Sequence, residues 1–181
     1  INKTGADYGP IFEDCRAMHV EILPPDINRS GDSFCLENGC IRYGLSGIKG
    51  INEGAGRIVQ MREGVRTYQP FLSVADFFQR CSERKEGMIN KKDAENLIYA
   101  GCFDCFVDNR KELFERYEQV VSCEEIAPAK VNEVCFEPFV LPKDEVFNRE
   151  QEVALLGTLI SDNPLQKYKD SSVYGCMEYN E

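Results

Sequence analysis

The stretch Gly44–Arg62, GLSGIKGINEGAGRIVQMR, places five glycines in nineteen positions and still shows the apolar spacing of helices. Each glycine would destabilise a helix interior by about 1 kcal/mol relative to alanine. Apolar side chains nevertheless recur at helical intervals on both sides of the glycine-rich centre. The pattern therefore predicts two helices, one ending at Ile48 and one beginning near Glu53, joined by a tight turn.

Gly50 is the residue at which this turn is expected to bend, because glycine adopts left-handed backbone conformations without steric cost. Ile51 is expected to point into the core and tie the two helices together. The amides of residues 50–54, with the unpaired N–H groups that open the second helix, would then face outward and attract an anion. A DNA phosphate fits such a site, and Lys49 and Arg57 can add positive charge beside it.

This spacing is that of a helix-hairpin-helix motif: apolar-x-x-apolar, then Gly-apolar-Gly, then a small residue four positions on. Asn52 stands in place of the second glycine, and asparagine is among the residues that best tolerate left-handed dihedrals. The motif binds the sugar-phosphate backbone of duplex DNA and so positions the duplex without reading its sequence. The motif positions are filled by Leu45, Ile48, Gly50, Ile51 and Gly56. The predicted DNA-binding residues are Lys49, Gly50, Ile51, Asn52, Gly54 and Arg57, with Gly101 at a second hairpin.

The charge distribution sets limits on this interpretation. The chain of 181 residues is 43% hydrophobic and 29% charged, which suits one domain or two small ones with a buried core. Its net charge of −10 argues against general attraction to nucleic acid or anionic membranes. Between Cys40 and Pro70, however, five basic residues oppose two acidic ones. We therefore expect a locally basic DNA face whose binding is weak and salt-sensitive.

The cysteines and the hydropathy pattern predict a cytoplasmic protein without a membrane segment. Nine cysteines form an odd and irregularly spaced set, in which Cys102 and Cys105 make the one CxxC pair and His19 is the single histidine. Reduced thiols used as small apolar residues are favoured over a zinc site. No apolar run approaches the ~18 residues of a membrane helix. The absence of an initiator Met suggests a piece of a longer protein.

The remaining pattern predicts a mainly α fold, a tandem helix-hairpin-helix with a small β-hairpin before its first unit. Asn38-Gly39, between two alternating segments, is typical of a type I′ turn. Helices are expected over residues 10–20, 70–81, 90–100, 110–121 and 150–160. The first is expected to bury Ile11, Cys15 and Met18. Caps are expected at Ser73, Asn90 and Asn109, with Gly101 ending the helix before the second hairpin.

In the order of its motifs the chain resembles the alpha subunit of bacterial DNA polymerase III, the C-family replicative polymerase. The resemblance runs from about residue 8 to 168, and its matching passages include Ile41–Gly50 and Leu155–Leu165. It implies the end of the fingers over 1–30 and a tandem helix-hairpin-helix DNA-binding domain over 31–122. It further implies a linker over 123–150, then a helix and tail over 151–181 that lead to an oligonucleotide-binding domain outside this chain.

The resemblance also implies partners: double-stranded DNA, the sliding clamp and other subunits of the polymerase III holoenzyme. The palm carboxylates and their Mg²⁺ ions belong upstream, so no catalytic residue, metal or cofactor is expected in this fragment. A clamp-binding segment is expected within 120–150, where Val134 and Phe136 form a degenerate match. A linker whose aromatic residues pack locally is the alternative.

Two other function classes remain open at this point. In the first, the acidic half of the chain and residues 132–147 dock a clamp or another replisome subunit, and the salt dependence of duplex binding separates this from DNA binding. The second is a base-excision glycosylase built on the same hairpin. It is disfavoured because Pro24-Pro25-Asp26 precedes the hairpin and no lysine nucleophile is suitably placed.

Overall fold

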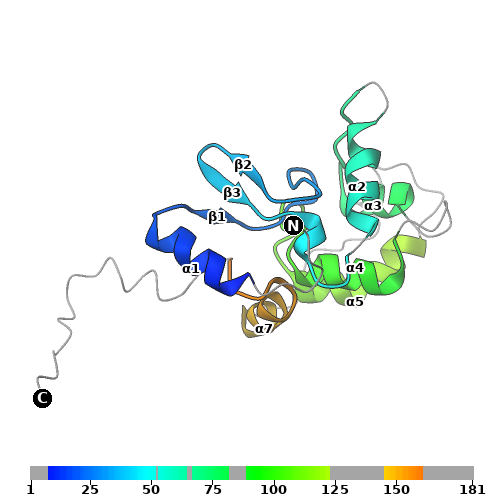
Figure 1. Cartoon of the computed structure of the whole chain (residues 1–181). Coiled ribbons are helices and arrows are strands. Elements are labelled where there is room, and N and C mark those ends of the chain that lie inside the picture. Colours follow the sequence, from blue (N-terminus) through cyan, green and yellow to red (C-terminus); the bar gives the residue numbers. More distant parts are fainter. Residues whose placement is uncertain (1–7, 52, 65–66, 82–88, 123–144, 161–181) are drawn as a thin grey trace, which may run out of the picture.

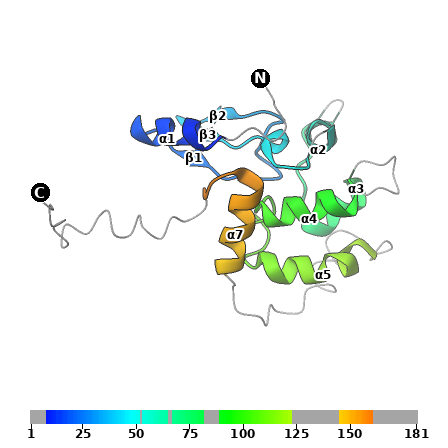
Figure 2. The same ribbon diagram turned by 60° about the horizontal axis from the view of Figure 1, so that its bottom comes forward.

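The computed structural model describes residues 8–51, 53–64, 67–81, 89–122 and 145–160. It is mainly α, as predicted, with a small sheet before the first hairpin. Helix α1 (Gly9–Ala17) lies beside the sheet, while α4 (Lys91–Tyr99) and α5 (Arg110–Ser122) lie side by side on the other side of the molecule. Helix α7 (Glu145–Leu156) runs across the ends of α4 and α5 (Figure 2).

The sheet has three strands in the order β1-β3-β2, with β1 at Ile22–Leu23, β2 at Cys35–Glu37 and β3 at Cys40–Arg42. Strands β2 and β3 are antiparallel and form the predicted hairpin. Asn38 and Gly39 have φ angles of 53° and 85°, and positive φ at both central residues is the requirement of a type I′ turn. The parallel pairing of β1 with β3 was not predicted.

Helix α1 is rotated relative to its predicted orientation. Ile11 and Met18 are 57% and 66% exposed, and Phe12 is buried together with Cys15. The reason is an aromatic cluster, since the Phe12 ring lies 5.9 Å from the ring of Tyr43. Burying a phenylalanine removes more apolar surface from water than burying the isoleucine beside it, so the helix turns Phe12 inward.

The end of α1 explains the single histidine. His19 is exposed and has a φ of 59°. Its N–H donates to the carbonyl of Arg16, and the N–H of Val20 donates to the carbonyl of Cys15. These two bonds are the pattern of a left-handed helix C-cap. His19 is thus a helix cap residue.

The first helix of the opening hairpin is shorter than predicted. It is the single 3₁₀ turn η1 (Leu45–Gly47), followed by the turn at Gly50 and by α2 (Glu53–Glu63). Gly44 is extended, and a Cβ there would lie 2.5 Å from the backbone nitrogen of Phe34. This close backbone approach prevents the helix from extending toward the N-terminus.

The three caps expected from the sequence are present. Asn90 and Asp93 form a reciprocal capping box at the start of α4, and Asn109 accepts from the amide of Glu112 at the start of α5. Helix α3 (Val74–Cys81) begins after Ser73, whose hydroxyl accepts from the amide of Asp76. The Asp76 carboxylate accepts from the amide of Leu72, one residue before the cap.

Helix α7 begins at Glu145, earlier than the predicted Glu150, and ends at Leu156 instead of residue 160. Gly157 has a φ of 79° and its amide donates to the carbonyl of Val153, which is how a glycine ends a helix. Leu156 is buried in the same core as the two hairpins. Helix α7 therefore packs as part of the hairpin unit.

Candidate nucleic-acid interface

The first hairpin presents an exposed corner at Lys49-Gly50. Gly50 has a φ of 88°, in the region that glycine favours. Ile48 and Ile51, on the two sides of the corner, are buried, so the bend is anchored while its tip reaches solvent. The amide of Ile51 donates to the carbonyl of Ile48 at 3.1 Å and is therefore not available to a ligand. The expectation of outward amides throughout 50–54 is wrong at this residue.

The tip of the corner is held by two other elements. The amide of Lys49 donates to the carbonyl of Leu155 on α7 at 3.2 Å. The carbonyl of Lys49 accepts from Asn96 Nδ2 on α4 at 3.1 Å. Within the part of the chain that the structure describes, the amide of Gly50 has no hydrogen-bond partner. The corner thus offers one available N–H, on an exposed glycine whose neighbouring backbone groups are fixed.

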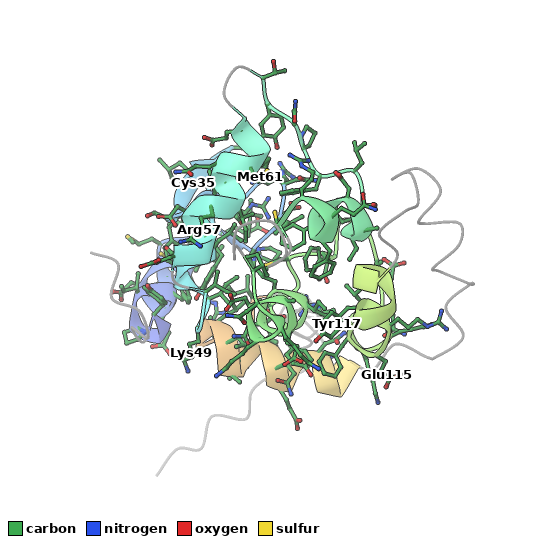
Figure 3. The ribbon with its side chains drawn as sticks, turned by 90° about the vertical axis from the view of Figure 1, so that its right-hand side faces the viewer. Cys35, Lys49, Arg57, Met61, Glu115 and Tyr117 are labelled. Atoms are coloured by element: carbon green, nitrogen blue, oxygen red, sulfur yellow. The ribbon has the colours of Figure 1, made fainter. Side chains whose placement is uncertain are left out.

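Helix α2 follows the corner and adds its first turn to the surface. The first N–H groups of a helix have no intrahelical acceptor, which applies here to Gly54. Glu53 is also in this turn, and its carboxylate lies 3.6 Å from the guanidinium of Arg57. Both side chains are exposed, at 89% and 45%. Figure 3 shows Arg57 on α2, with Lys49 lower on the same side of the view. Lys49 at the corner, with Glu53 and Arg57 in the first turns of α2, therefore brings two cations and one carboxylate to this part of the surface.

The second hairpin has the same bend in a different environment. Gly101 has a φ of 82°, its amide donates to the carbonyl of Ile98, and the amide of Cys102 donates to the carbonyl of Leu97. The space where a Cβ of Gly101 would lie is occupied by the guanidinium of Arg110. This corner is buried and its amides are engaged.

A family model described as "Helix-hairpin-helix motif" matches residues 19–113, from the end of α1 into α5. The chain belongs to the helix-hairpin-helix family.

It is also similar to curated proteins named DNA polymerase III subunit alpha. The Aquifex aeolicus protein is 37% identical over 163 residues, or 88% of this chain, and the Thermus aquaticus protein 34% over 168 residues, or 87%. The Chlamydia pneumoniae protein is 34% identical over 185 residues, or 90%. The resemblance seen in the motifs is thereby confirmed, and the chain spans 13–14% of the length of these relatives.

The basic face of the first helix-hairpin-helix unit is smaller than the sequence indicated. Arg42 is buried and donates to Glu37 and to the carbonyl of Pro24. Arg62 is buried and donates to the backbone carbonyls of Ile27 and Ser30. Neither guanidinium can reach a phosphate. They hold the loop between β1 and β2 in place. Two of the five basic residues that the sequence places between Cys40 and Pro70 are therefore missing from the expected basic DNA face.

Arg110 explains why the second hairpin is closed. Its guanidinium contacts Asp104 at 2.5 Å and Glu152 on α7 at 3.1 Å. Burial lowers its pKa, but the hydrogen bonds that it donates to Asp104 and the charges of both carboxylates outweigh that effect, so the pKa of Arg110 is raised. Arg110 is therefore a fixed cation that joins α5 to α7.

Cys102 and Cys105 do not form a reactive pair at this hairpin. Cys102 is buried, and burial raises the pKa of both thiols above the ordinary value. The described cysteines are free, and among the described residues no group of three or more His, Cys, Asp or Glu side chains is arranged to hold a metal. None of the helices in the described ranges has the length and apolarity needed to span a bilayer.

Three predicted residues lie outside the described residues: Asn52 in the corner, and Val134 and Phe136 in the expected clamp-binding segment. Sequence reasoning in turn missed Asn96 and Leu155, which hold the corner. Asn96 is 47 positions from Lys49, and nothing in the local pattern of α4 distinguishes it from an ordinary polar helix residue.

Proposed function

We propose that this chain is a duplex-DNA-binding module of a DNA polymerase III alpha subunit, and that it contacts the phosphate backbone through the Lys49-Gly50 corner. The observation that supports this most is the exposed left-handed Gly50 between two buried isoleucines, whose amide has no hydrogen-bond partner among the described residues. An oriented N–H beside a helix start is a good donor to a phosphate oxygen. Lys49 and Arg57 add charge at neighbouring phosphates.

The proposed contact is limited in extent. With Arg42 and Arg62 inside the protein and Gly101 covered by Arg110, the DNA face consists of the first hairpin and the start of α2. A few phosphate contacts on a chain of net charge −10 give weak binding that salt suppresses. Such a module would increase the affinity of a larger polymerase, located in the cytoplasm, for duplex DNA. Polymerisation and its metal ions are not part of the proposal for this chain.

Fluorescence anisotropy of a labelled duplex, titrated with the chain at several salt concentrations, tests the proposal. We expect affinity to fall steeply with salt and to be nearly abolished in the double variant Lys49→Glu, Arg57→Glu. A matched double reversal at Arg16 and Lys111, which lie on other elements, should have a much smaller effect. Binding that survives the first double reversal would contradict the proposal.

The alternative is a protein-docking module for a sliding clamp or another holoenzyme subunit, which the polymerase resemblance also implies. Its expected segment at Val134 and Phe136 remains a prediction. The duplex titration separates the two functions. A module that docks a protein partner through the acidic half and residues 132–147 would show duplex binding that neither salt nor the reversal of Lys49 and Arg57 changes.

A further inference from the structure

Asn96 contacts the first hairpin from another helix, at the point where the proposed phosphate contact is made. Its side-chain amide donates to the carbonyl of Lys49 at 3.1 Å. Asn96 is in α4, which belongs to the second helix-hairpin-helix unit, and it is only partly buried. A polar residue that joins the two units at the exposed corner is not required by the folding of either unit alone.

The consequence follows from peptide geometry. The carbonyl of Lys49 and the N–H of Gly50 belong to one peptide group, and the described part of the chain contains no cis peptide. In a trans peptide these two groups point in opposite directions. Because Asn96 holds the carbonyl toward α4, the Gly50 N–H must point away from α4. Gly50 is an exposed residue.

The space around Gly50 supports the same conclusion. A Cβ built on Gly50 would lie 2.5 Å from Asn96 Nδ2, so the asparagine amide fills the volume that a side chain would take. The preceding peptide is also fixed, since the Lys49 amide donates to Leu155 and the Ile48 carbonyl accepts from Ile51. Among the residues that the structure describes, Asn96 therefore supplies the one side-chain hydrogen bond to the corner, and the other bonds come from backbone groups.

We propose that Asn96 is a positioning residue, which orients the Lys49–Gly50 peptide so that the Gly50 amide donates to a DNA phosphate. The proposal rests on the proposed function of the corner. Donation from Asn96 to the Lys49 carbonyl also polarises the peptide and strengthens its N–H as a donor. The second unit would then contribute to DNA binding by shaping the first, without touching DNA at Gly101.

The test compares Asn96→Ala with two other variants of the 181-residue chain in duplex titrations at several salt concentrations. Asn96→Ala should lower duplex affinity about three- to tenfold, as expected for one lost hydrogen bond, with the salt slope unchanged. Lys49→Ala should lower affinity and also reduce the slope by about one unit, because it removes a cation that displaces counterions. Asn90→Ala removes the N-cap of the same helix and should leave affinity unchanged.

Asn96→Ala should remain folded, because the side chain is partly exposed and alanine is a better helix former. A second measurement does not depend on DNA. The NMR amide resonance of Gly50 should shift or broaden in Asn96→Ala, where the peptide can rotate, and stay unchanged in Asn90→Ala.

An Asn96→Ala variant with wild-type affinity and an unchanged Gly50 resonance would overturn the inference. If the wild-type chain itself binds no duplex, the proposed function fails, while the Gly50 resonance still reports whether Asn96 orients the peptide. The two failures are therefore distinguishable.

Discussion

At the scale of single residues, Gly50 and Gly56 have different structural roles, although they are six positions apart in the same motif. Gly50 has a positive φ, and the Asn96 amide occupies the place that its Cβ would take. Gly56 is an ordinary helical residue whose Cβ would meet nothing closer than Asp32 at 4.0 Å. The motif spacing alone does not separate a glycine that is needed for backbone conformation from one that is merely tolerated.

The first prediction compares alanine at these two positions. Gly50→Ala should destabilise the protein by about 1–3 kcal/mol, because a left-handed alanine is strained and its Cβ meets the Asn96 amide. Gly56→Ala should be neutral or stabilise by up to about 1 kcal/mol, because alanine favours the helix. Urea unfolding of both variants provides the measurement. Equal destabilisation at the two sites would contradict this account of the corner.

The second prediction concerns Glu53, the carboxylate beside the proposed phosphate site. It opposes a bound phosphate and partly neutralises Arg57 through their contact at 3.6 Å. Glu53→Gln should therefore raise duplex affinity about two- to fivefold at low salt, an effect of the size expected for an exposed charge. Glu63→Gln, at the other end of α2, makes the same chemical change and serves as the control. Equal effects of the two variants would show that only net charge matters.

At the scale of elements, α7 joins parts of the molecule that are distant in sequence. Tyr43 on the segment after β3 donates its hydroxyl to the carbonyl of Leu156, and Arg110 on α5 pairs with the fully buried Glu152. Burial raises the pKa of Tyr43, so its hydroxyl stays protonated as a donor. Helix α7 is thus bonded to both hairpins, to the first through Tyr43 and to the second through Arg110.

The third prediction tests the ion pair between Arg110 and Glu152. Glu152→Ala should destabilise the protein by about 3 kcal/mol, because it leaves part of a buried guanidinium and the amide of Ile160 without their acceptor. Asp104→Ala should cost less, about 1 kcal/mol, because that carboxylate is 44% exposed and its pair with Arg110 is better screened. Chemical unfolding measures both. A smaller loss from Glu152→Ala than from Asp104→Ala would contradict the role assigned to α7.

The fourth prediction concerns the sheet and pH. The hydrogen bond from Arg42 lowers the pKa of Glu37 below its ordinary value of 4.5. A carboxyl whose pKa is lower in the folded state stabilises the protein above its unfolded pKa, and this contribution is lost as pH falls through the folded pKa. Stability should therefore decline below about pH 4.5, and Glu37→Gln should flatten part of that decline. Thermal unfolding between neutral and acid pH measures the effect, and an unchanged acid limb in Glu37→Gln would contradict it.

At the scale of the whole molecule, the sequence identified what depends on residues close in the chain. The Asn38-Gly39 turn, the caps at Asn90 and Asn109 and the bend at Gly50 were all predicted, because each is decided within a few positions by backbone preference or a short hydrogen bond. The mainly α class and the helix-hairpin-helix motif follow from the same local signals.

Features that depend on distant contacts were missed. Arg42 and Arg62 look like surface cations in the sequence, yet each is buried because it satisfies carbonyls of the loop between β1 and β2. The hydrogen bond from Asn96 to the Lys49 carbonyl and the packing of α7 against the core depend on tertiary contacts. The spacing of apolar residues along the chain does not indicate such contacts. The size of the DNA face was misjudged for this reason.

The account depends most on the claim that the Gly50 amide meets a DNA phosphate, and NMR of the isotope-labelled chain during a titration with a short mixed-sequence duplex tests it directly. The Gly50 amide proton should show one of the largest shifts, downfield as expected for a new hydrogen bond, and the shift should reverse when salt is added. The amide of Gly101, already bonded to Ile98, should stay in place. A Gly50 resonance that does not move while resonances of other surfaces shift would contradict the central claim.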